Sequence, residues 1–424
     1  MKKENKMKKS TKLLVGLASM LSLSLLLSGC GSSSSKSTTI QFFSTKTENA
    51  STYKQLISQF EKKNPNIKVQ LSSPSNAGTV LKSDLAKNSI PDVMAVGGDV
   101  NYQQVQKAGV LEDLSGESFT KTTMPEYQKM ITSISKGNKL DAVPYATNAS
   151  GIVYNKTLFA KAGITKTPTT WNELITDAKT LKAHGITPFE MPFQDSWTTM
   201  GVFNQLDSNM ISSSWINKRL DNKTTFLSSH KGVMQKYLTL CKYAQSDYMG
   251  TSYNDGTKAL AEGKAAMMIN GNFVIPQAKQ LKKNIKLDMF KMPVNNDSSK
   301  NKVTSGIDVA FAISKKSKVQ AADKKFVKFL MSKKNSQLYN KQQFSFSAIK
   351  GVAQKDASLE GISSYLTSGN VVNYPDHYYP DGFDMTAVLT QTGVNQSKGM
   401  SDSKNITATL KKADKAFDSA NVKD

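Results

Sequence analysis

The chain has 424 residues, of which 38% are hydrophobic, with two cysteines and a formal charge of +23 at pH 7. This composition is typical of a folded, water-soluble protein with room for two domains, and two cysteines exclude a small fold held together by disulfides. The lysines are dispersed and no aromatic-rich basic stripe accompanies them, so the charge favours a solvated basic surface over nucleic-acid binding.

The first 30 residues have the pattern of an export signal. Six lysines within residues 1–12 precede an uncharged, mostly apolar stretch at 13–27, which is too short to span a bilayer comfortably. Leu27-Ser28-Gly29-Cys30 then resembles a bacterial lipobox. This resemblance implies a lipoprotein signal peptide at 1–29, with a lipid on Cys30. An ordinary signal peptide with an incidental cysteine is the alternative.

The residues after the signal indicate where the protein resides. The serine-rich residues 30–37 have too little apolar surface to fold and predict a flexible tether. A lipid on Cys30 would hold the body at the outer face of the cytoplasmic membrane, as in a Gram-positive bacterium. With Cys30 acylated, Cys241 has no partner, so no disulfide is expected.

From residue 38 onward, strand-like and helix-like patterns alternate. TIQFF (39–43) predicts a strand. Apolar residues then recur at helical spacing between 53 and 60, after the potential cap Asn49, and Asn64-Pro65-Asn66 should end this helix. Strands alternating with helices imply βαβ units and a parallel sheet. Ligands bind beyond the carboxyl ends of such strands, so the loops 44–48 and 97–101 should face one crevice. The other elements predicted here are a strand at 67–71, a helix through 80–85 and a strand at 91–96.

Six stretches resemble the extracellular solute-binding proteins of ABC transporters, specifically the family that binds sugars and oligosaccharides. They occur in the family's order over nearly the whole chain that follows the signal. The stretches are FEKKNPNIKV (60–69), IPDVMAVGGD (90–99), AGVLEDLS (108–115), VPYATNASGIVYNKTLFAKAGITKTPTTWNEL (143–174), EGKAAMMINGNF (262–273) and GIDVAFAISKKSKVQAADKKFVKFL (306–330).

The resemblance implies an α/β fold of the periplasmic-binding-protein-like type II class. In this fold two α/β lobes are joined by hinge segments, and the ligand cleft lies between them. Composition alone suggests two sequential domains, so the discontinuous division depends on the resemblance. The crossings are expected near 146–149, 302–306 and 344–348. The expected lobes are an N-lobe of 38–147 plus 303–345 and a C-lobe of 148–302 plus 346–424.

Sugar chemistry decides which residues are candidates for the cleft. Sugar hydroxyls both donate and accept hydrogen bonds, and burying one without a partner costs several kcal/mol. A sugar pocket therefore needs carboxylates and amides. Flat aromatic rings suit the apolar C–H faces of the sugar.

Four polar candidates lie near the expected crevice and hinges. Glu48 follows the first strand, and Asp99 ends the strand PDVMAV, at a position where the family uses an acid on sugar hydroxyls. Asn148 lies at the first hinge and Asp308 lies near the second crossing. The structural alternatives are a helix start for Glu48, a helix cap for Asp99 and a hinge amide for Asn148.

The expected C-lobe supplies the aromatic candidates. Trp197, in FQDSWTTMG, follows a predicted strand and is expected to stack on a pyranose, with Asp195 binding hydroxyls; a core position is the alternative for Trp197. Phe273 matches a position where the family often has an aromatic floor, and its smaller ring predicts weaker stacking. Asn272 before it is either a ligand contact or a helix cap.

Residues 373–384 are the densest aromatic and acidic cluster in the chain. Members of the family often close the C-lobe side of the cleft with such a segment, and Tyr379 and Asp381 are its candidates. The alternative is a surface loop before a helix at 385–389. Trp171 and Trp215 are assigned to packing.

Catalytic motifs are not evident in the sequence. The three histidines have unrelated contexts without an HxxxH pair, so no metal site is expected, and no G-x-S-x-G elbow occurs. The alternatives that remain are the same fold with phosphate, an iron chelate or a polyamine as ligand, and a tethered glycoside hydrolase. Tyr374, Tyr378, Tyr379 and His377 keep the iron-type site open.

The expected function is therefore that of a membrane-anchored receptor for an ABC importer, and not of an enzyme. It would close its lobes on a sugar or oligosaccharide and deliver it to the transmembrane permease subunits. The expected partners are a carbohydrate, the permease, and the membrane through the lipid on Cys30. No cofactor and no nucleic acid are implied, and a monomer is expected.

Overall fold

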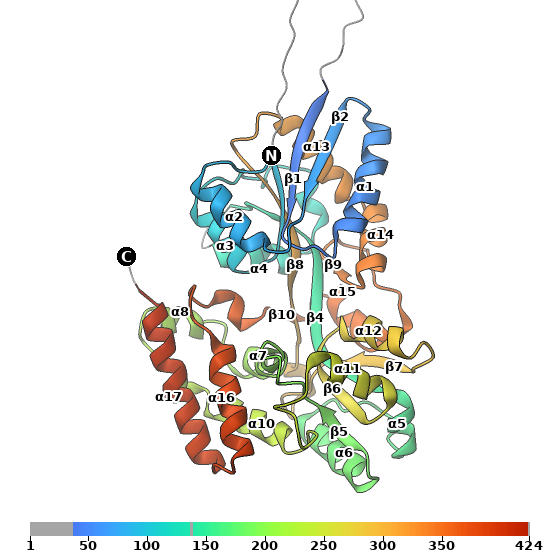
Figure 1. Cartoon of the computed structure of the whole chain (residues 1–424), viewed down its shortest axis with the longest axis vertical. Coiled ribbons are helices and arrows are strands. Elements are labelled where there is room, and N and C mark those ends of the chain that lie inside the picture. The colour runs from blue at the N-terminus through green and yellow to red at the C-terminus, as the bar shows by residue number, and fades with distance from the viewer. Residues whose placement is uncertain (1–36, 136–138, 423–424) are drawn as a thin grey trace, which may run out of the picture. The chain divides into compact units, whose positions relative to one another are not determined.

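The body of the protein is built on one mixed β-sheet (Figure 1). The structure is a computed structural model that describes residues 37–135 and 139–422; the predicted signal peptide, Cys30 and tether residues 30–36 lie outside this part of the chain. Within the described residues the strands are β1 (Thr38–Ser44), β2 (Ile67–Ser72), β3 (Val93–Val96), β4 (Val143–Asn155), β5 (Thr187–Glu190), β6 (Ala265–Gly271), β7 (Leu287–Phe290), β8 (Val303–Ile313), β9 (Phe346–Ser347) and β10 (Val371–Val372).

The sheet has the strand order β2-β1-β3-β8-β4-β6-β5. Strand β1 is parallel to β2 and β3, and β5 is parallel to β6, whereas β8 is antiparallel to β3 and to β4. The expectation of a parallel sheet is therefore correct only for parts of it. The physical reason is that β8 comes from far along the chain and inserts between β3 and β4 in the opposite direction, which βαβ units do not produce.

Two long strands connect the two ends of this sheet. The first half of β4, Val143–Ser150, pairs with Thr304–Phe311 of β8, and the last residues of β8 also pair with β3. The second half of β4 pairs with β6 and β7 instead. The ladder between β4 and β8 shifts register on both sides of Ala146, and β9 pairs with β4 at Ala146 and Thr147. Such an irregularity locally bends and twists a strand.

Helices cover both faces of the sheet. The described α-helices are α1 (Ala50–Lys63), α2 (Ala77–Ala86), α3 (Val100–Lys107), α4 (Pro125–Ser135), α5 (Lys156–Lys161), α6 (Trp171–Ala183), α7 (Thr198–Met210), α8 (Trp215–Leu220), α9 (Phe226–Ser229), α10 (Lys231–Cys241), α11 (Tyr253–Glu262), α12 (Val274–Leu281), α13 (Gln320–Leu330), α14 (Lys333–Gln343), α15 (Glu360–Thr367), α16 (Met385–Ser397) and α17 (Asp402–Ala420). Short 3-10 turns lie at Thr120–Thr122, Ser298–Lys300, Ala357–Leu359 and Pro375–Tyr378.

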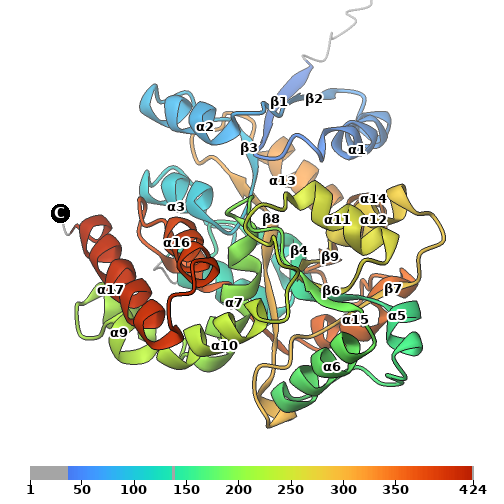
Figure 2. The same ribbon diagram turned by 60° about the horizontal axis from the view of Figure 1, so that its bottom comes forward.

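Alternation along the strands sends neighbouring side chains into different cores. Phe42 packs with residues of α1, α13 and α14, whereas Phe43 packs on the opposite face with residues of α2, α3 and α4. At the other end of the sheet, Met267 faces α6, α7 and α10 and Met268 faces α11, α12 and α15. Figure 2 shows the C-terminal helices α16 and α17 packed beside each other and next to α9 and α10.

The elements predicted near the N-terminus are confirmed. Strand β1 and helix α1 have the expected positions, and α1 ends at Lys63, directly before the predicted stop at Asn64. Asn49 is the N-cap residue of α1, but its side chain makes no capping bond and donates to the Tyr339 hydroxyl instead. The predicted strand at 91–96 begins at Val93.

The remaining tryptophans and the internal cysteine are packing residues. Trp215 is buried and Trp171 is partly buried against the same core, as predicted. Cys241, at the end of α10, is buried, and burial raises the pKa of its thiol to about 12. Among the described helices, none combines the length and the apolar character that crossing a membrane requires.

Candidate functional site

The loops that follow β1 and β3 lie beside each other, because these strands are parallel neighbours. Lys46 in the first loop contacts the Asp308 carboxylate on β8 and lies 4.0 Å from Glu48. Burial opposes the charge of Lys46, but the carboxylates of Asp308, Glu48 and Asp99 outweigh it and raise the Lys46 pKa above its usual value. The expected crevice between the two loops is thus occupied by a partly buried ion pair.

Asp99 is the N-cap of α3, where its Oδ1 accepts a hydrogen bond of 2.9 Å from the backbone N–H of Asn101. Its Oδ2 remains for another partner. A Cβ on Gly97 would lie 2.6 Å from this Oδ2, so the glycine provides the room for the carboxylate. Glu48, in the first loop, is the more exposed acid.

Three aromatic rings form a cluster at the start of α7. The ring centroid of Trp197 lies 4.9 Å from that of Tyr253 and 6.0 Å from that of Phe273. Trp197 is 45% exposed and Phe273 is 38% exposed, whereas Tyr253 is buried beneath them. We call Trp197, Tyr253 and Phe273 the aromatic cluster. Its exposed surface offers flat apolar area on a body that buries most of its large hydrophobic side chains.

Asp195 positions this cluster from inside the protein. Its Oδ2 accepts a hydrogen bond of 2.6 Å from the backbone N–H of Tyr253, at the start of α11. Its carbonyl accepts from the Thr198 hydroxyl at 2.8 Å, at the start of α7. Asp195 therefore joins the two helix starts that carry Trp197 and Tyr253, through its backbone carbonyl and its carboxylate.

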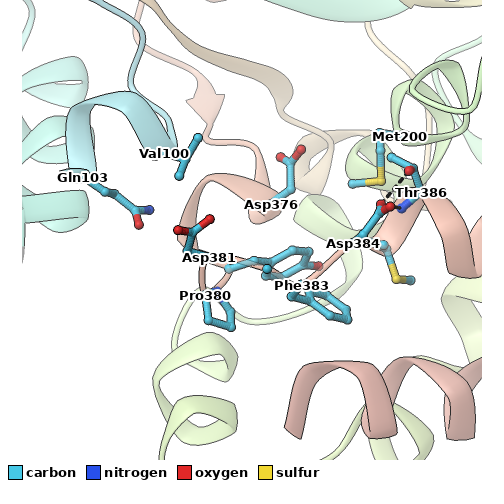
Figure 3. A pocket seen from close by; sticks show the side chains of 12 residues that line it. Val100, Gln103, Met200, Asp376, Pro380, Asp381, Phe383, Asp384 and Thr386 are labelled. Atoms are coloured by element: carbon cyan, nitrogen blue, oxygen red, sulfur yellow. Dashed lines mark hydrogen bonds between the residues drawn. The ribbon is translucent and has the colours of Figure 1, made fainter. Parts of the chain in front are cut away.

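A cavity of about 240 Å³ begins one helical turn beyond Trp197 (Figure 3). One side is made by α3, and the other by Met200 of α7 and the segment that runs into α16. Figure 3 shows Val100 and Gln103 facing the carboxylates of this segment across the cavity. The lining residues are Val100, Gln103, Met200, Asp376, Tyr379, Pro380, Asp381, Gly382, Phe383, Asp384, Met385 and Thr386.

The carboxylates in this cavity differ in their hydrogen-bond partners and in their exposure. Asp384 caps α16 through a hydrogen bond of 2.9 Å from the Thr386 N–H, and Asp376 accepts one of 3.1 Å from the Asn204 amide. Asp381 is exposed. Tyr379 is buried, and burial raises the pKa of its phenol well above the usual range. The cavity thus offers Asp381 and the second oxygen of Asp376 to hydroxyl groups.

Direct contacts join α3 and β8 to the segment 373–384, which leads into α16 and partly lines this cavity. The Gln103 amide donates a hydrogen bond of 2.8 Å to the carbonyl of His377. Gly306 of β8 lies under the same segment, where a Cβ would lie 2.5 Å from the Tyr374 ring and 2.9 Å from the His377 ring. Glycine at position 306 therefore permits the segment to approach the β4–β8 ladder closely.

The two predicted amides lie behind the cleft surface. Asn148 is partly buried on β4, and its Oδ1 is buried without a hydrogen-bond partner among the described residues. Asn272 is only 3% exposed, and backbone groups occupy both polar atoms of its amide. The side chain of Asn272 therefore supports the surface around Phe273 from within.

The structure thus arranges the predicted residues in three groups. Asp195, Trp197 and Phe273 meet at the aromatic cluster; Tyr379 and Asp381 line the cavity; Glu48, Asp99 and Asp308 surround Lys46. Sequence reasoning missed Lys46, Gln103, Tyr253 and Asp376. Lys46 lies in the loop 44–48 and Asp376 in the cluster 373–384, both of which the sequence analysis selected as segments, and Ser252 followed by Asp255 marks a helix start at Tyr253. Gln103 has no such signal.

The arrangement is suited to binding a neutral polar molecule with apolar faces. Exposed rings cover C–H surface, and free carboxylate oxygens accept from hydroxyl groups. Within residues 37–135 and 139–422, no group of three or more His, Cys, Asp or Glu side chains is arranged to hold a metal ion.

Comparisons with known proteins agree with this geometry. Residues 44–337 match the family model described as bacterial extracellular solute-binding protein. The multiple sugar-binding protein of Streptococcus mutans is 30% identical over 413 residues, which is 95% of this chain and 97% of that protein. The solute-binding protein RafE in complex with raffinose is 26% identical, with a TM-score of 0.75 over 91% of this chain and all of that one. The apo form of RafE from Streptococcus pneumoniae is 27% identical, with a TM-score of 0.78 over 89% of this chain and 98% of that one.

Proposed function

Because this chain belongs to the family of bacterial extracellular solute-binding proteins and has its two-lobe periplasmic-binding-protein-like fold, we propose that it captures a sugar or oligosaccharide for an ABC importer. The relatives named above are solute-binding proteins, one of them a multiple sugar-binding protein and one bound to raffinose. The proposed role is binding and delivery to the permease subunits, without catalysis.

The aromatic cluster is the observation that carries this proposal. Trp197 and Phe273 leave large parts of their rings exposed next to a cavity with free carboxylate oxygens. Exposed rings of this kind lose contact with water when a sugar covers them, and carboxylates satisfy the hydroxyls at the sugar's edge. A phosphate ligand would be repelled by Asp376 and Asp381, and a ferric site needs a ligand set that the cavity does not assemble.

We assign the lobes as 38–147 plus 303–345 and 148–302 plus 346–424. The contacts that support this division are those of β4 and β8. Strand β8 pairs with β3 at one end and with β10 at the other, and β4 pairs with β8 along its first half and with β6 and β7 along its second half. The candidate cavity then lies where α3 of one lobe meets α7 and the segment before α16 of the other. Closure would bring Asp99 and Glu48 toward the aromatic cluster and exclude water from the sugar.

A thermal-shift screen tests the choice of ligand. We expect raffinose or a related oligosaccharide at about 100 times its Kd to add about 2.7 kcal/mol to the free energy of unfolding, because only the folded protein binds it. Monosaccharides such as glucose, and a sugar alcohol, serve as size controls. Stabilisation by phosphate, ferric chelates or spermidine but by none of the sugars would contradict the proposal, and so would release of reducing ends from a glycan.

The lipid on Cys30 is proposed to hold the protein at the outer face of the cytoplasmic membrane. Cys30 lies outside the described residues, so this proposal depends on the lipobox in the sequence. Replacing Cys30 by serine should remove the acylated residue and release the protein from the membrane fraction into the medium. Membrane fractionation with a palmitate label measures this, and a Cys30→Ser protein that remains labelled and membrane-bound would refute the anchor.

A further inference from the structure

Asn272 occupies a tight turn between β6 and α12, directly before the exposed ring of Phe273. The side chain of Asn272 is 3% exposed, while that of Phe273 is 38% exposed. A Cβ on Gly271 would lie 2.2 Å from the Phe273 ring, so the ring lies directly against the backbone at Gly271. The position of the Phe273 ring therefore depends on where the turn is held.

The Asn272 amide links this turn to two other segments. Its Oδ1 accepts a hydrogen bond of 2.9 Å from the backbone N–H of Ala149 on β4, and its Nδ2 donates one of 2.6 Å to the carbonyl of Phe344. The backbone N–H of Asn272 also donates to the Ala149 carbonyl at 3.0 Å. One residue therefore connects the turn that carries Phe273 with β4 and with the end of α14.

Both partners lie at the connections between the two halves of the sheet. Ala149 is three residues from Ala146, where the β4–β8 ladder changes register. Phe344 ends α14 in a left-handed conformation with φ of +52°, which is unusual for a residue with a side chain, and β9 follows it and pairs with β4. The Asn272 amide satisfies the carbonyl of this strained residue at a helix end, where no helical N–H is available.

A second contact ties α12 to the same region. Lys279 of α12 lies over the Phe344 ring, with 5.7 Å between its ammonium and the ring centroid, and its ammonium is 2.9 Å from Asp356. The turn before α12 and Lys279 within α12 are therefore both held against the end of α14 and the region after it.

We propose that Asn272 is a positioning residue that couples the sugar-facing Phe273 to the hinge. This inference rests on the proposed function. When a ligand contacts Phe273, Asn272 passes the resulting shift of the turn to Ala149 and Phe344. A ligand that presses on the Phe273 ring acts on a turn in which the Asn272 side chain is bonded to two of the three expected crossings, at Ala149 and at Phe344. Loss of the Asn272 amide frees the hinge and leaves the ring without its support.

The test combines calorimetry with raffinose and small-angle X-ray scattering. Asn272→Ala should raise the raffinose Kd about ten-fold and increase the radius of gyration of the unligated protein, because the link between the lobes is lost. In the Asn272→Ala background, Phe273→Ala should weaken binding by a much smaller factor than it does in the unmodified protein. A purely structural role of Asn272 would leave the two factors independent.

Asn405→Ala is the matched control. Asn405 is also fully buried and bridges two segments, donating to the Thr392 carbonyl at 3.0 Å and accepting from Asn395 at 3.1 Å, but all of these residues belong to α16 and α17. This variant should keep the radius of gyration and the raffinose affinity. Asn272→Asp keeps the acceptor for Ala149 but faces the Phe344 carbonyl with an oxygen that cannot donate. It therefore breaks the same link between the lobes, and it should raise the raffinose Kd and the radius of gyration in the same direction if Asn272→Ala does not fold.

The inference is overturned if Asn272→Ala keeps both the affinity and the radius of gyration, or if Asn405→Ala changes them equally. An unmodified protein that does not bind raffinose would count against this sugar in the proposed function. The radius of gyration of the unligated variants would then be sufficient to test the role of Asn272. An increase in Asn272→Ala but not in Asn405→Ala would support the inference, and no increase in Asn272→Ala would overturn the inference.

Discussion

Replacing Trp197 by alanine should raise the sugar Kd by about 30-fold, which corresponds to about 2 kcal/mol of lost stacking and burial. Trp197 is 45% exposed, so nearly half of its surface is available to a ligand. The free energy of unfolding of the unligated protein should fall by only about 1 kcal/mol, because Trp197→Ala removes only the ring contacts with Tyr253 and Phe273. Calorimetric titration and thermal unfolding measure the two effects separately.

Trp215 provides the matched control for this experiment. It is 8% exposed and packs edge-on against Phe226 at a centroid distance of 4.7 Å, in the core beside α9. Trp215→Ala should therefore cost about 3–5 kcal/mol of stability through the cavity that it leaves, while the folded variant keeps its sugar affinity. Normal sugar binding by Trp197→Ala would show that the aromatic cluster is not the ligand surface.

Replacing Arg219 by alanine should reduce the free energy of unfolding by about 3 kcal/mol, because the substitution removes a buried side chain that packs on Phe417 and leaves the partly buried Asp414 without its cation. Arg219 is 2% exposed, and its guanidinium lies 2.5 Å from Asp418 and 4.5 Å from the Phe417 ring centroid. It also donates to the carbonyl of Asp414, whose carboxylate accepts from the Phe226 and Leu227 N–H groups at the start of α9. Arg219 thus holds α8 against α17, and the Asp414 carboxylate holds the start of α9 against the same helix.

Urea unfolding measures this loss of stability, with Lys223→Ala as control. Lys223 pairs with Asp221 at 3.1 Å a few residues away, but both side chains are mostly exposed, so its removal should cost under about 0.5 kcal/mol. Arg219→Lys keeps the charge but loses the planar guanidinium and its stacking on the ring. Its loss of stability should therefore lie between those of Arg219→Ala and Lys223→Ala. Equal stabilities for Arg219→Ala and Lys223→Ala would contradict the structural role given to Arg219.

Local elements of this fold can be predicted from the sequence because their signals are local. The apolar spacing of α1 and the stop at Asn64 are properties of short segments, and both agree with the structure. The place of β8 has no such signal, since Val93 and Ile313 become partners across more than half of the chain. The resemblance to solute-binding proteins gave the two-lobe fold, whereas periodicity gave only alternating strands and helices.

In the candidate site, too, only residues with a local signal could be predicted from the sequence. Trp197 could be chosen because it follows a strand at the expected crevice, and the structure exposes its ring. Gln103 and Asp376 face the same cavity only because α3 and the segment before α16 meet in three dimensions. Lys46 and Asp308 are 262 residues apart, and nothing near either residue marks the other as its partner. Contacts of this kind depend on tertiary packing, which spacing along the chain does not encode.

The burial of Cys241 decides how the protein behaves toward thiol chemistry. With a pKa of about 12, its sulfur is almost never a thiolate near neutral pH, and the thiolate is the nucleophile in exchange and alkylation. Two copies of the body therefore do not become cross-linked through this sulfur in oxidising surroundings. A cysteine introduced at the surface of the described body would in turn be modified by a maleimide dye while Cys241 stays untouched, so fluorescent reporters can be placed without first removing the native residue.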